Sequence, residues 1–93
     1  MDFRDVMPKY RVDYYNVSFN GYVFDKTRYF YNLTLHELYN YLVSYAKDHY
    51  DSDLLAIYVS KENAQNVNQI FSIHIGAHIF VEDARTSKCA ILK

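Results

Sequence analysis

Apolar and polar residues alternate over two runs that flank Asn20-Gly21 near the start of the chain. This dipeptide is typical of a two-residue hairpin turn, because both residues tolerate the positive φ angles that such a turn requires. With that turn, Asp13 lies opposite Arg28, and the opposite charges of this pair favour the register. The segment therefore predicts an antiparallel hairpin.

The two faces of the hairpin differ in polarity. We expect the first face to belong to the core, and it carries Tyr15, Val17, Phe19, Tyr22 and Phe24. The second face is half polar and carries Tyr10, Tyr14, Tyr29 and Tyr31. We expect these four tyrosines to be exposed.

A helical pattern follows the hairpin. Thr34 with Glu37 three residues later forms a capping box, which places the start of the helix at Leu35. Apolar or amphipathic residues then recur at helical spacing at Leu35, Leu38, Tyr39, Leu42, Ala46 and His49. The opposite side is polar, so the pattern predicts a surface helix that packs on a sheet.

Two further segments have the two-residue period of β-strands, residues 54–60 and residues 69–82. The second contains Gly76, and a hairpin turn at Gly76-Ala77 would place Ile79 beside His74 and mix the two faces. We therefore favour one long strand that is bulged or kinked at the glycine. Residues 84–93 show no period.

These elements predict a single α+β domain over residues 1–93, with about 1–9 and 84–93 fraying at the ends. Its two layers are one helix and a mostly antiparallel sheet of about four strands, in the order β-β-α-β-β.

The composition restricts the function. The chain of 93 residues has a net charge of −1, so it lacks the basic surface that binds a phosphate backbone. No secretory signal and no apolar run of about 18 residues is evident. Cys89 is the only cysteine and can form no internal disulfide. We expect a cytoplasmic protein without membrane contact or cofactor.

His74 and His78 are weak candidates for a metal site. On one regular strand they would lie about 13 Å apart, at roughly 3.3 Å per residue, so they could not bind one ion. No nucleophile motif and no glycine-rich phosphate loop occurs, so we expect no catalytic residues and no bound metal. A small enzyme built from these histidines and distant groups is the third hypothesis.

Two surfaces are candidate protein-binding sites. The first is acidic, and its members are Glu37, Asp48, Asp51 and Asp53; a metal site and an ordinary solvated loop are the alternatives. The second is aromatic, and its members are Tyr10, Tyr14, Tyr29 and Tyr31, with Tyr41 of the helix added. Tyrosine is favoured at protein interfaces, but exposed rings on a sheet can also stack nucleic-acid bases.

We expect a small non-enzymatic protein-binding module that forms homodimers. In size and in its lack of motifs, the chain is similar to small accessory proteins of phages and plasmids. Some of these proteins inhibit host nucleic-acid-handling or defence proteins by occluding a surface. The second hypothesis is a weak single-stranded nucleic-acid binder that uses its tyrosines.

Overall fold

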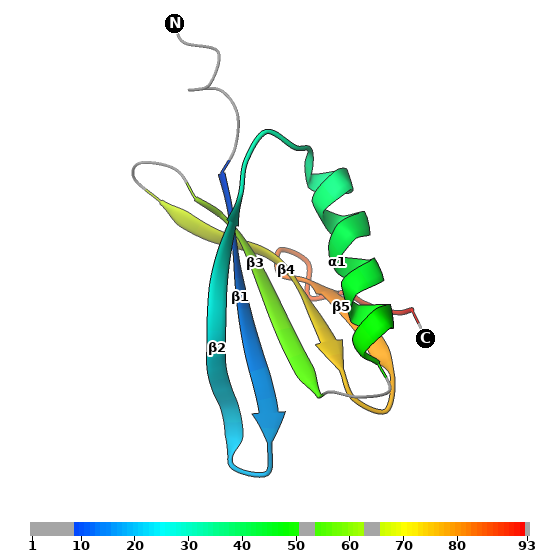
Figure 1. Ribbon diagram of the computed structural model, residues 1–93. Coiled ribbons are helices and arrows are strands. Elements are labelled where there is room, and N and C mark those ends of the chain that lie inside the picture. The colour runs from blue at the N-terminus through cyan, green and yellow to red at the C-terminus, as the bar shows by residue number, and fades with distance from the viewer. Residues whose placement is uncertain (1–8, 51–53, 63–65, 93) are drawn as a thin grey trace, which may run out of the picture.

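A computed structural model describes residues 9–50, 54–62 and 66–92. One helix packs on one face of a six-stranded antiparallel sheet (Figure 1). In chain order the elements are β1 (Lys9–Ser18), β2 (Gly21–Phe30), α1 (Leu35–His49), β3 (Leu55–Glu62), β4 (Val67–Ile75), β5 (Ile79–Asp83) and β6 (Cys89–Ile91). Across the sheet the strand order is β2-β1-β3-β4-β5-β6. The α+β class is confirmed, but the sheet has two strands more than expected.

The helix forms as the sequence predicts. Thr34 precedes it, and its hydroxyl accepts a hydrogen bond of 3.1 Å from the Glu37 backbone N–H. The Glu37 carboxylate in turn accepts one of 2.9 Å from the Thr34 backbone N–H. Leu38, Leu42 and Ala46 point into the core with no exposed surface, so the expected apolar side of α1 is the side that meets the sheet. With 15 residues, α1 is the only helix of the described segments, and it is too short and too polar to cross a bilayer.

The turn of the first hairpin is displaced by one residue from the predicted position. Ser18 pairs with Gly21, so the turn residues are Phe19 and Asn20. Gly21 alone takes a positive φ here, at 108°, which glycine adopts without a steric penalty. The displaced turn and a β-bulge at Asp25 together place Asp13 opposite Thr27 and not opposite Arg28.

The prediction of which hairpin face is buried was wrong. Tyr10, Val12 and Tyr14 lie under the helix with exposed fractions of 5%, 0% and 2%, whereas Phe19 at the turn is fully exposed. The buried set continues across the sheet with Leu55, Ile57 and Val59 of β3 and with Phe71, Ile73 and Ile75 of β4. Both faces of the hairpin carry large apolar side chains, so the local pattern did not show which face meets α1.

The prediction of one strand over residues 69–82 was also wrong. The chain turns at Gly76–His78, where the Gly76 N–H donates to the His78 carbonyl at 3.0 Å. Ile75 then pairs with Ile79, and His74 pairs with Phe80. A three-residue loop keeps residues of like polarity on the same face, which the two-residue turn considered from sequence would not do. Within the end expected to fray, residues 89–91 form β6 and pair with β5.

Candidate binding surface

The open face is the side of the sheet opposite α1. The segments that the structure describes contain no helix on this side (Figure 1). By alternation along the strands, its members are Lys9, Arg11, Asp13, Tyr15 and Val17 of β1; Tyr22, Phe24, Thr27 and Tyr29 of β2; Ala56, Tyr58, Ser60 and Glu62 of β3; Val67, Gln69, Ser72 and His74 of β4; Phe80 and Glu82 of β5; and Cys89 and Ile91 of β6.

Rings in contact run across the open face from β2 to β5, and we call them the aromatic row: Phe24, Tyr22, Tyr15, Tyr58, His74 and Phe80. The Tyr15 ring lies 5.7 Å from Phe24 and 5.4 Å from Tyr58, centroid to centroid. Tyr58 is 5.6 Å from His74, and His74 stacks on Phe80 at 5.0 Å with an angle of 14° between the rings. These distances lie within the range of favourable aromatic pairs. Cross-strand pairing therefore assembles one continuous aromatic band from five strands.

Charged groups of the open face are largely paired with each other. Arg11 Nε lies 3.1 Å from Asp13 Oδ2, and Lys9 Nζ lies 3.9 Å from Glu62 Oε1. The hydrogen bond and charge of Asp13 raise the pKa of Arg11. With Glu82 included, the face carries two cations and three carboxylates, so it offers no surplus of positive charge to a phosphate backbone.

His74 occupies a structural position within the aromatic row. Its Nε2 lies 2.9 Å from the Ser72 hydroxyl oxygen. Burial lowers the pKa of His74, and the nearby Glu82 carboxylate partly opposes this shift, so the imidazole is neutral at pH 7. Ser72 is only 2% exposed. Its hydroxyl therefore cannot meet a substrate in this conformation, and the pair does not form a nucleophile with its base.

The two histidines considered as metal ligands occupy different settings. His74 lies on β4, and His78 is exposed in the turn that follows. Within the described residues, no three His, Cys, Asp or Glu side chains form a group that could hold a metal ion.

The structure separates the predicted tyrosine set. Tyr10 and Tyr14 belong to the core, and burial raises the pKa of Tyr14 to about 12. Tyr29 and Tyr31 are exposed near Lys9, whose Nζ lies 4.5 Å and 6.0 Å from their ring centroids. Tyr41 is 44% exposed on the helix and lies 5.6 Å from the Phe30 ring. The expectation that Tyr10 and Tyr14 are exposed with the others was wrong.

The predicted acidic set is not assembled by the described residues. Glu37 is engaged in the capping box, where hydrogen bonds from Thr34 lower its pKa. Asp48 is eleven residues further along α1, which at 1.5 Å per residue places it about 16 Å away along the axis. Asp51 and Asp53 lie outside the described residues.

Sequence reasoning missed three residues of the aromatic row as site residues, Tyr15, Tyr58 and Phe80. Tyr15 was assigned to the core, while Tyr58 and Phe80 were not considered as site residues. A signal was present, because Tyr58 alternates with buried Ile57 and Val59, and Phe80 shares the face of His74. Strand pairing was needed to bring them together.

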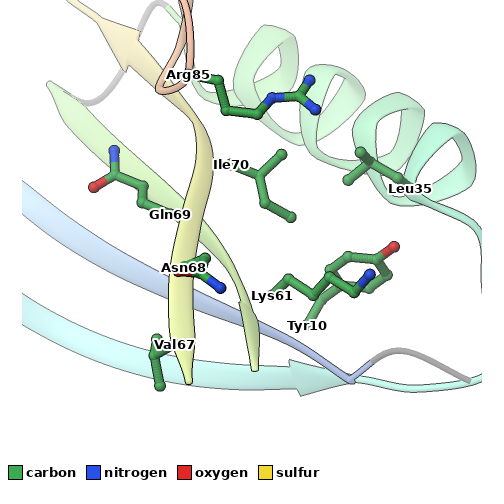
Figure 2. A pocket seen from close by; sticks show the side chains of 8 residues that line it. All are labelled: Tyr10, Leu35, Lys61, Val67, Asn68, Gln69, Ile70 and Arg85. Carbon is green, nitrogen blue, oxygen red and sulfur yellow. The ribbon is translucent and has the colours of Figure 1, made fainter. Parts of the chain in front are cut away.

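A hollow of about 570 Å³ lies on the other side of the sheet, beside the start of α1 (Figure 2). Leu35 of the helix, Tyr10 of β1 and Ile70 of β4 form its apolar wall. Figure 2 shows two basic side chains, those of Lys61 and Arg85, at its border. Arg85 is paired with Asp83 at 3.4 Å, so the charge of this one of the two basic side chains is partly compensated.

Comparison with protein-family models, with curated proteins and with solved structures finds no match for this chain.

Proposed function

We propose that this protein is a non-enzymatic binding module that contacts another protein through the open face. The aromatic row supports this proposal. Two of its six rings are more than half exposed, Tyr22 at 53% and Phe24 at 56%, and the other four are partly exposed. An apolar band of this extent on a sheet is typical of an interaction surface.

The chemistry of the open face favours a protein over other partners. Tyrosine, phenylalanine and arginine are enriched in protein interfaces, and large rings often supply most of the binding energy. Tyrosine also gives contact area at a low entropic cost, because it has only two side-chain torsions. Here the rings are held further by contacts with each other, so little order has to be gained on binding.

The proposed form of binding is occlusion of a surface on the partner, as expected from sequence for an inhibitor of a nucleic-acid-handling or defence protein. The acidic surface predicted from sequence as a protein contact included Glu37 and Asp48, and their separation along α1 argues against one patch that contains both. We therefore assign the contact to the open face and not to the acidic helix end.

Single-stranded nucleic acid is the second candidate partner, and one observation favours it. The rings of the aromatic row follow each other at 5.0–6.4 Å, and bases can stack on such a series of exposed rings. The balance of charges on the open face opposes it, because single-strand binders combine stacking with a basic groove.

The test uses affinity capture from cells of the source, with quantitative mass spectrometry of the captured proteins. Tyr58→Ser and Phe80→Ser change the middle and the far end of the aromatic row. Tyr41→Ser is the matched control, since Tyr41 is an exposed tyrosine on the helix. The proposal predicts one or more proteins that the wild type and the control retain and that both row variants lose.

Equal capture by all four proteins would contradict the proposal. Anisotropy with a labelled oligothymidine distinguishes the second candidate. Binding that weakens in Tyr58→Ser and declines with added salt would replace protein binding by nucleic-acid binding.

A further inference from the structure

The two edges of the sheet differ in length. β2 forms one edge with ten residues, whereas β6 forms the other with three. A long edge strand presents a row of backbone N–H and C=O groups that can pair with another strand. The exposed fractions along β2 are high, with Tyr22 at 53%, Val23 at 55%, Phe24 at 56% and Tyr29 at 46%.

A β-bulge lies at the middle of β2. Phe24 pairs with Tyr15 and Lys26 pairs with Tyr14, so Asp25 is an extra residue between two successive pairs. The bulge changes which residues point to the open face. Before it they are Tyr22 and Phe24, and after it they are Thr27 and Tyr29.

This bulge restricts how β2 could pair with a copy of itself. In an antiparallel pair, opposite residues lie on the same face of the sheet. For a regular strand this condition pairs even-numbered residues with even-numbered ones. When a residue before the bulge lies opposite a residue after it, the same condition pairs an even-numbered residue with an odd-numbered one. No residue then lies opposite its own copy, so the two-fold axis passes between two neighbouring residues.

One register satisfies this condition with the whole strand. Its axis passes between Asp25 and Lys26 and pairs Gly21 with Phe30 at the ends. Tyr22 then lies opposite the partner's Tyr29, and Phe24 lies opposite the partner's Thr27, all four on the open face. Val23 lies opposite the partner's Arg28 on the helix side.

The charges at the centre fit this register. Asp25 lies opposite the partner's Lys26, and symmetry repeats the contact, so two pairs of opposite charge form at the axis. A lysine that protects an edge strand from pairing would face a lysine of the second copy, and the two like charges would repel. Here the two charges at the centre are opposite in sign and adjacent in sequence.

We propose that the chain forms a two-fold symmetric homodimer by antiparallel pairing of β2 with the partner's β2, in the register that places Asp25 opposite the partner's Lys26. The two sheets then form one continuous sheet, and the two open faces lie side by side on the same surface. This assembly does not depend on the proposed function, because it uses the strand edge. Tyr22 and Phe24 then border the partner strand, while Tyr15, Tyr58, His74 and Phe80 lie on strands that the pairing does not touch.

Charge exchange tests both the dimer and its register. Sedimentation velocity at about 100 µM resolves a dimer of micromolar Kd. The wild type is expected to sediment as a dimer. Asp25→Lys places like charges opposite each other twice, and so does Lys26→Asp. Each change is expected to raise the Kd by at least about tenfold, from two reversed cross-strand pairs.

The decisive sample is an equimolar mixture of the two variants. In a mixed dimer the chain with two positive charges faces the chain with two negative charges, so both pairs are again opposite in sign. The mixture is expected to form dimers that neither variant forms alone. The double variant D25K/K26D is also expected to dimerise like the wild type, because it restores opposite charges in both pairs. It replaces the mixture as the test if circular dichroism shows that one single variant does not fold.

Three results would overturn the proposal. The first is a wild-type monomer at this concentration. The second is a dimer that Asp25→Lys leaves intact, which would place the interface elsewhere. The third is failure of association in both the mixture and the double variant, which would reject this register.

Discussion

The placement of Tyr14 and Tyr29 on opposite sides of the sheet predicts a large difference between two alanine variants. Both tyrosines were expected from sequence to share one exposed face. In the structure Tyr14 is 2% exposed and packs edge-on against Tyr45 of α1 at 5.5 Å. Tyr29 is 46% exposed, and Lys9 lies over its ring.

The expected magnitudes follow from these environments. Tyr14→Ala removes a ring between helix and sheet and leaves a cavity, which should cost about 3–5 kcal/mol of unfolding free energy, as for a buried aromatic residue. Tyr29→Ala leaves no cavity and loses mainly the contact with the Lys9 cation, which is worth about 0.5–1 kcal/mol at an exposed site.

Urea denaturation followed by circular dichroism measures both losses. Thermal melting gives a second readout, in which Tyr14→Ala should lower Tm by more than about 12 °C, at 4 °C or more per kcal/mol for a domain of this size. Similar small losses in the two variants would refute the assignment of Tyr14 to the core. A larger loss for Tyr29→Ala would show that the hairpin faces are reversed.

Three smaller effects test the helix cap and the environments of Glu37 and His74. Thr34→Ala should lower the unfolding free energy by about 1 kcal/mol, because it removes an N-cap; an unchanged urea midpoint would contradict the capping box. Hydrogen bonds from Thr34 lower the pKa of Glu37. The ionised Glu37 carboxylate therefore stabilises the folded protein fully above its unfolded pKa of about 4.3, and this stabilisation is lost as pH falls through the lower folded pKa. Glu37→Gln should therefore reduce the loss of stability in acid, and identical pH profiles would argue against this role. Burial lowers the pKa of His74 in the folded protein. As pH falls, the His74 imidazole is therefore protonated in the unfolded chain before it is protonated in the folded one. The unfolding free energy then decreases between about pH 6.5 and the folded pKa. An NMR titration should find the His74 pKa below its usual value, and an unshifted curve would show that the ring is more exposed than its stacking on Phe80 implies.

The helix was predictable from sequence because its signals are local. The capping box of Thr34 and Glu37 and the helical spacing of Leu38, Leu42 and Ala46 depend on neighbours within one or two turns. The α+β class followed from the same reasoning, since a helix with one apolar side beside alternating segments has to pack on a sheet.

The faces of the first hairpin were not predictable, because the choice depends on contacts distant in sequence. Tyr14 and Tyr15 are the same residue type in adjacent positions, and either could be buried. The choice is made by β3, whose Ile57 pairs with Tyr14 on the helix side while Ala56 pairs with Tyr15 on the open face. A sequence pattern with apolar groups on both faces does not contain this information.

The second hairpin was missed for a different reason. Gly76 was recognised as an irregularity, but only a two-residue turn was compared with a continuous strand. A loop of three residues, Gly76–His78, retains the alternation that the continuous strand was chosen to explain. The aromatic row was missed as a consequence, because His74 and Phe80 become neighbours only when β4 and β5 pair.

Site-specific photo-cross-linking in cells would capture a protein that contacts the open face. A photoreactive phenylalanine derivative at position 58 places the probe in the aromatic row, and the same derivative at position 41 places it on the helix. If the open face is the contact surface, position 58 gives cross-links to protein and position 41 gives none. Cross-links from position 41 alone, or cross-links from position 58 to nucleic acid alone, would contradict this proposal.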